Sequence, residues 1–124
     1  MIAHIVLFNP KQDVSSELLR LCAQLLERLS REIAGVRRAS VGRRIEIEAG
    51  YARPFGEMTY QNVCVIEFLD TPSLTAYLTH PLHRELGRLF WELCESAVVV
   101  ESEMVDAKTE SLEKFLVPDL KRHD

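Results

Sequence analysis

The side chains best suited to proton transfer gather in one segment of the sequence, AYLTHPLH at residues 76–83. Pro81 disfavours helical geometry at the residue before it and suits the first turn of a new helix, which predicts His83 in that turn. Positive potential at a helix N-terminus disfavours imidazolium, so we expect a neutral His83 that accepts a proton as a general base. Tyr77 would donate its hydroxyl to a carbonyl oxygen on which negative charge develops. His4, in an apolar strand, would hydrogen-bond the same ligand.

The same residues have two further interpretations. In a purely structural one, His80 and His83 cap the helix and Tyr77 packs its ring; in the other, they bind a ligand without chemistry. A metal site is not predicted, because Pro81 breaks the helix between the two histidines and no further ligands follow at a suitable spacing. The glycines are scattered and fit no phosphate-binding fingerprint, so no cofactor is expected.

Composition indicates one globular domain. The chain has 124 residues, 47% hydrophobic and 27% charged, with a net charge of −4. A mildly acidic chain has no general electrostatic attraction for nucleic acid or an anionic membrane, so neither is expected as a partner. The chain has an odd number of cysteines, three, and each sits in an apolar stretch, which predicts buried free thiols in a reducing compartment and a cytoplasmic protein. The apolar stretch at 2–8 is far too short for a membrane span.

The spacing of hydrophobic residues predicts the helices and strands that carry the candidate site residues. The hydrophobic pattern predicts an amphipathic helix over 14–33, with Asp13 as its N-cap. Gly35 is expected to close this helix in a left-handed backbone conformation. Further helices are expected at 71–79 and 81–93, and strands at 2–8, 36–48, 62–68 and 97–100. The order β-α-β-β-α(α)-β predicts a ferredoxin-like α+β fold with a four-stranded antiparallel sheet and its helices on one face.

Three of the expected strands are apolar on both faces. Helices cover only one face of such a sheet, so a partner should cover the other, and a homodimer that packs sheet against sheet is the simplest solution. The long loop at 50–60 is expected to lie over a site. The domain is expected over 1–102. The tail 103–124 would form a short helix from near Asp106 on the partner subunit, or be partly disordered. Phe90 and Trp91 are expected to pack helix against sheet.

Several segments together resemble the stress-responsive A/B barrel (Dabb) family from about Met1 to Glu101. They are HIVLF at 4–8, IAGV at 33–36, Gly42, and above all AYLTHPLH at 76–83. The resemblance implies ferredoxin-like subunits whose sheets pair into a dimeric α+β barrel. One plant member closes a linear polyketide by an aldol reaction with a tyrosine and a histidine, and those positions match Tyr77 and His83.

The resemblance also implies a set of site residues. His83, Tyr77 and His4 are the catalytic candidates, because the plant cyclase has a further histidine that matches His4. His80 and Asn62 are the substrate-binding candidates, although the cyclase has a histidine where this chain has Asn62.

Two functions from different classes remain open on the sequence alone. The first is a homodimeric protein of this family that holds a small apolar carbonyl or phenolic ligand between helices and sheet, without catalysis. The second is a cofactor-free cyclase, isomerase or lyase that acts on a polyketide-like carbonyl substrate through Tyr77 and His83.

Overall fold

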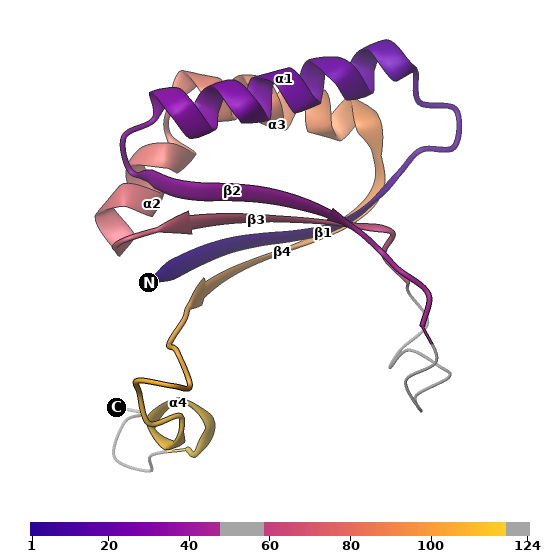
Figure 1. Cartoon of the computed structure of the whole chain (residues 1–124). Coiled ribbons are helices and arrows are strands. Elements are labelled where there is room, and N and C mark those ends of the chain that lie inside the picture. The colour runs from indigo at the N-terminus through magenta and orange to yellow at the C-terminus, as the bar shows by residue number, and fades with distance from the viewer. Residues whose placement is uncertain (48–58, 119–124) are drawn as a thin grey trace.

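The structure is a computed structural model that describes residues 1–47 and 59–118 (Figure 1). Its elements are β1 (Ile2–Pro10), α1 (Ser16–Glu32), β2 (Val36–Arg43), β3 (Asn62–Phe68), α2 (Thr71–Leu78), α3 (Pro81–Leu93), β4 (Cys94–Glu103) and α4 (Glu113–Leu116). The strands form one antiparallel sheet in the order β2-β3-β1-β4, and Figure 1 shows α1 and α3 together over one face of it. This is the ferredoxin-like arrangement that the sequence predicts. None of the described helices is long and apolar enough to cross a membrane.

The two ends of α1 differ from the prediction. The hydroxyl of Ser15 accepts a hydrogen bond from the Leu18 amide at 3.0 Å, so Ser15 is the N-cap and Asp13 is not. At the other end, Gly35 does not adopt the left-handed conformation that was expected. A Cβ at this position would lie 3.0 Å from the Cβ of Ser73, so glycine serves here to let the chain approach α2 closely.

Three other boundaries differ from the prediction because strand pairing decides them. The strand β2 ends at Arg43, well short of residue 48, because Arg43 pairs with Asn62, the first residue of β3. The strand β4 runs over residues 94–103, longer than the expected 97–100, because it pairs with β1 along its whole length. In the tail, the helix lies at 113–116 and does not start near residue 106. The expected loop at 50–60 lies outside the described residues except for its last two.

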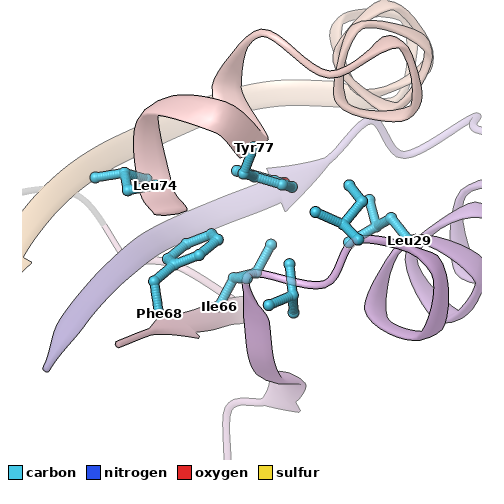
Figure 2. Close-up of a cluster of buried hydrophobic side chains, with 7 residues drawn as sticks. Leu29, Ile66, Phe68, Leu74 and Tyr77 are labelled. Carbon is cyan, nitrogen blue, oxygen red and sulfur yellow. The ribbon is translucent and has the colours of Figure 1, made fainter. Parts of the chain in front are cut away.

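The hydrophobic core lies between the sheet and the helices, at the end of the molecule where α2 packs (Figure 2). Tyr77 of α2, Phe68 and Ile66 of β3, and Leu29 of α1 are its largest fully buried side chains. Further along the sheet, the ring of Phe8 meets that of Phe90 edge to face, with 5.3 Å between centroids. This confirms the predicted packing of Phe90. Trp91 was expected to pack in the same way, but it is 82% exposed.

The other face of the sheet carries no helix among the described elements. Alternation along the strands places an apolar set on this face, since neighbours in a strand point to opposite sides. Ile5 pairs with Val65 and Val100, and Leu7 pairs with Val63 and Val98, which forms a continuous apolar patch across β3, β1 and β4. We call this set the open-face patch: Ile5, Leu7, Val63, Val65, Val98 and Val100.

Candidate functional site

A cavity of about 860 Å³ lies between the sheet and the helices α1 and α3. Its size falls within the range of about 300–1,000 Å³ typical of small-molecule sites. Most of its lining is apolar, with Val6 and Phe8 from β1, Leu26 from α1, and Leu86 from α3 among the side chains. Its polar side chains include His4, Tyr77, His83 and Glu101, which come from four different elements. A mostly apolar hollow with a few converging polar groups is suited to a small, largely apolar ligand.

His83 lies in the first turn of α3, as predicted, two residues after Pro81. Its Nδ1 lies 3.0 Å from the carbonyl oxygen of Leu78. A carbonyl oxygen only accepts, so Nδ1 carries the hydrogen and Nε2 keeps its lone pair. Burial lowers the pKa of His83 below its ordinary value of 6.5 and outweighs the hydrogen bond to the Leu78 carbonyl, which raises it; the nearby His4 lowers it further and Glu101 raises it, each by less. His83 is therefore a neutral imidazole near pH 7 with a free basic nitrogen.

Tyr77 is 1% exposed, and its ring lies in the core beside Phe68, with 5.2 Å between the centroids. Burial raises the pKa of its hydroxyl well above the ordinary value of 10, and the nearby Cys64 and Glu101 raise it further. The hydroxyl therefore stays protonated and remains a hydrogen-bond donor. The hydroxyl has no hydrogen-bond partner among the described residues. Every fully buried side-chain polar atom of those residues does have one, so the Tyr77 hydroxyl is not fully buried and opens onto the cavity that Tyr77 lines.

His4 forms a pair with Glu101 across the β1–β4 ladder. The two residues lie directly opposite each other, and Nδ1 of His4 is 2.6 Å from Oε1 of Glu101. The carboxylate accepts this hydrogen, which fixes the imidazole ring and leaves Nε2 as its other polar atom. Glu101 was not predicted as a site residue, because the last strand was expected to end at residue 100. The signal that would have found it is the alternation of Ala97, Val99 and Glu101, which places all three on the cavity side.

The three aromatic groups converge. The ring centroids of Tyr77 and His83 are 4.7 Å apart, and the centroid of His4 lies 5.8 Å from that of Tyr77 and 6.4 Å from that of His83. One ligand carbonyl can therefore reach a hydroxyl donor and a basic nitrogen together. That combination can remove a proton from carbon next to the carbonyl while stabilising the charge on its oxygen.

Of the two predicted substrate-binding residues, Asn62 lines the cavity and His80 does not. His80 is the N-cap of α3, where its Nδ1 accepts a hydrogen bond from the Leu82 amide at 3.0 Å, and it is not part of the cavity lining. Asn62 does line the cavity, but it pairs with Phe8, four residues along β1 from His4. At about 3.3 Å per residue, that puts it about 13 Å from the histidine cluster. Asn62 also donates to the carbonyl oxygen of Gly42 at 3.3 Å.

The cysteines are also placed near the cavity. Cys22, Cys64 and Cys94 are free and half-buried, and all three belong to its lining. Burial raises the pKa of each thiol, to about 11 for Cys64 and about 12 for Cys94. Protonated thiols are poor nucleophiles, so these side chains contribute apolar surface. Within residues 1–47 and 59–118, no group of three His, Cys, Asp or Glu side chains is arranged to hold a metal ion.

Comparison with known proteins identifies relatives of this fold. The family model of the stress responsive A/B barrel domain (Dabb) matches residues 2–104, while no curated protein matches the chain. A dimeric ferredoxin-like protein of unknown function from Bacteroides fragilis is 27% identical, with a TM-score of 0.60 over 83% of this chain and 95% of that one.

Two further solved structures share the fold at lower identity. A Dabb family protein from Mesorhizobium loti is 22% identical, with a TM-score of 0.62 over 85% of this chain and 97% of that one. A hydroxynitrile lyase from Passiflora edulis is 14% identical, with a TM-score of 0.69 over 85% of this chain and 94% of that one. Identities this low establish similarity of fold alone.

Proposed function

The chain belongs to the stress responsive A/B barrel (Dabb) domain family, and from that premise we propose that it is a homodimer that binds a small apolar carbonyl or phenolic compound. The proposal has two parts, a subunit interface on the open face of the sheet and a ligand site between the sheet and the helices. The single observation that carries the ligand site is the cavity of about 860 Å³, whose lining includes His83, Tyr77 and His4.

The open-face patch supports the dimer. Val98 and Val100 are 40% and 44% exposed, although they lie in the middle of a strand. A continuous apolar surface of this kind is unfavourable in water, and a second copy related by a two-fold axis buries it with a surface of the same shape. The Bacteroides fragilis protein, whose fold this chain shares, is itself dimeric.

A ligand titration tests the site. Trp91 is the only tryptophan of the chain and belongs to the cavity lining, so its fluorescence reports a ligand that enters. We expect small phenols and ketones to change this emission and to raise the melting temperature, because they bind the folded state alone. The substitution His83→Asn should weaken both effects.

The chain offers a matched control in its other histidine of the same helix. His80→Asn keeps a side chain that caps a helix well, and the residue lies outside the cavity, so ligand binding should be unchanged. Equal loss of binding in both variants would show that the histidines act through the stability of α3. Binding that neither variant affects would place the ligand elsewhere.

We propose proton transfer as the second candidate function, which the cluster of Tyr77, His83 and His4 favours. Nε2 of His83 would take a proton from carbon next to a ligand carbonyl, and the hydroxyl of Tyr77 would donate to the carbonyl oxygen. The resulting enolate is the intermediate that cyclases and isomerases of carbonyl compounds share. In D₂O, a bound ketone should therefore exchange its α-hydrogen for deuterium in the wild type but not in His83→Asn. Equal exchange in both would rule out His83 as the base.

We propose a cytoplasmic location, which the three free cysteines support. Proteins of oxidising compartments usually pair their cysteines, whereas Cys22, Cys64 and Cys94 remain thiols. Fractionation of the source cells would test this directly, and recovery in an extracytoplasmic fraction would contradict it.

A further inference from the structure

The C-terminal segment carries exposed apolar side chains away from its own sheet. After Glu103 the chain is held to the start of β1 by the hydrogen bond from the Met104 amide to the Met1 carbonyl oxygen, at 2.8 Å. Figure 1 then shows it leaving the sheet on the side opposite to α1 and α3, where it forms α4. The apolar side chains Phe115 and Leu116 are 46% and 76% exposed there. Because these side chains are exposed, packing against its own chain contributes little to the stability of this short helix.

A small hollow with suitable chemistry lies on the open face at the same end of the sheet. It has a volume of about 390 Å³ and is lined by Met1, Arg37, Arg38, Glu67 and Leu69. Leu69 is 63% exposed and Met1 is 54% exposed, so the hollow presents two uncovered apolar side chains beside two arginines. It is separate from the cavity under the helices, with which it shares no lining residue.

Strand register shows how the tail and the hollow relate. Val36, Phe68, Ile2 and Glu103 form one row across the sheet, so the end of β4 and the start of β2 lie at the same end but at opposite edges. Three strand spacings separate those edges, about 14 Å. Within one chain the tail therefore starts beside Met1, at the β1 side of the hollow, and leads away from the sheet, so it does not extend toward the arginines of β2.

In a dimer whose two-fold axis runs parallel to the strands, the tail of one subunit would reach the β2 side of the hollow on the other. Such an axis keeps the ends of the strands together and exchanges the edges, so the end of β4 in one subunit lies over the start of β2 in the other. Packed sheets are about 10 Å apart, and the nine residues from Met104 to Leu112 are long enough to cross that gap.

We propose that residues 104–118 dock onto the second copy of this chain, with Leu112, Phe115 and Leu116 seated against the partner's Met1 and Leu69. This inference rests on the proposed homodimer. Charge complementarity supports it, because residues 103–117 contain four acidic residues and two lysines, while the hollow presents two arginines, Arg37 and Arg38, and one acidic residue, Glu67. The Arg38 side chain is 74% exposed; its Nε donates to the Ser40 hydroxyl at 3.2 Å and lies 4.0 Å from Glu67 Oε2.

Disulfide trapping in the full-length protein tests the proposal. The double variant Leu69→Cys/Leu116→Cys should form a covalent dimer under mild oxidation, seen on a non-reducing gel. Each single variant and the wild type, treated in the same way, should remain single chains. The pair Ile45→Cys/Leu116→Cys is the control, because Ile45 is 73% exposed but follows the far end of β2.

The other outcomes separate the two claims. An intrachain disulfide, which gives a single chain of altered mobility, would mean that the tail folds back on its own subunit and would overturn the proposal. No disulfide in a protein that sedimentation shows to be dimeric would also overturn it, while leaving the proposed homodimer intact. A monomeric protein would overturn both.

A second measurement tests the contribution of the contact to assembly. Phe115→Ser/Leu116→Ser should raise the dimer dissociation constant about tenfold, because two apolar side chains lose a buried site. Ile45→Ser, which removes an equally exposed apolar side chain at the other end, should leave it unchanged. A dissociation constant that does not move in the tail variant would contradict the docking.

Discussion

Gly87 should be the position where stability and ligand binding can be changed in opposite directions. It lies in the middle of α3 and lines the cavity, and within the described part of the chain a Cβ placed on it would meet no atom within 4 Å besides the backbone of its own helix. Glycine inside a helix costs about 0.8–1 kcal/mol relative to alanine, because its backbone loses more freedom on folding. No structural contact offsets that cost, so Gly87→Ala should raise the free energy of unfolding by about 1 kcal/mol.

Urea unfolding measures this change directly, and thermal unfolding should show a rise of about 4 °C for a domain of this size. Gly42→Ala is the matched control, because a Cβ there would lie 2.9 Å from Cγ1 of Val63. Valine in a strand has little freedom to move aside, so this variant should lose about 1–3 kcal/mol. The same chemical change thus has opposite signs at the two glycines. A Gly87→Ala variant less stable than the wild type would refute the inference that the space beside α3 is empty.

A larger side chain at the same position tests what the space is for. Gly87→Phe places a phenyl ring in the cavity, where a phenolic ligand would otherwise lie. We expect the variant to fold and to bind phenols and ketones much more weakly than the wild type in the Trp91 fluorescence titration. If the variant folds and binds with unchanged affinity, the ligand site is not this cavity.

Three further predictions concern the site residues. Burial lowers the pKa of His83 below 6.5, so this side chain binds a proton more tightly in the unfolded chain than in the folded one. Its contribution to the free energy of unfolding is therefore complete above pH 6.5, and it is lost as the pH falls from 6.5 through the lowered pKa of the folded state. Urea unfolding between pH 5 and 8 should therefore show a steeper loss in the wild type than in His83→Asn, and equal slopes would contradict this. Tyr77→Phe should change the free energy of unfolding by less than about 1 kcal/mol, since its hydroxyl opens onto the cavity, whereas Leu29→Ala, at a fully buried site, should lose about 2–5 kcal/mol. A large loss in Tyr77→Phe would reveal a partner for the hydroxyl. Glu101→Leu removes the acceptor for Nδ1 of His4 and should alter the ¹⁵N shifts of that ring, and unaltered shifts would show that the pair does not form in solution.

Most of the fold could be predicted from the sequence, because periodicity reports directly which side chains a strand or helix must bury. The strand at 62–68 has the predicted bounds. The start of α1 was misplaced because Asp13 and Ser15 are both good helix caps, and only the hydrogen bond to Leu18 distinguishes them. Gly35 was misinterpreted because a glycine needed for close approach looks the same in sequence as one needed for a left-handed turn.

The site was harder to predict, because its residues come from distant parts of the chain. His4 and Glu101 are 97 residues apart, and only the register between β1 and β4 brings them together. His80 and His83 look equivalent in sequence, yet one ring caps α3 and the other lines the cavity. The difference follows from the direction of each side chain at the start of a helix, which spacing alone does not determine.

The break between α2 and α3 has a consequence for the acid–base properties of the neighbouring ring. In a continuous helix, the carbonyl oxygen of Leu78 would accept a hydrogen bond from the amide of Leu82, four residues later. Pro81 interrupts that pattern, so the Leu82 amide bonds to His80 instead and the Leu78 carbonyl is left for Nδ1 of His83. A proline that touches no ligand thereby decides which nitrogen of a nearby imidazole holds the proton. The backbone therefore determines the tautomer of His83. In a chain with an unbroken helix here, the Leu78 carbonyl would no longer be available to Nδ1, even if every cavity side chain were kept.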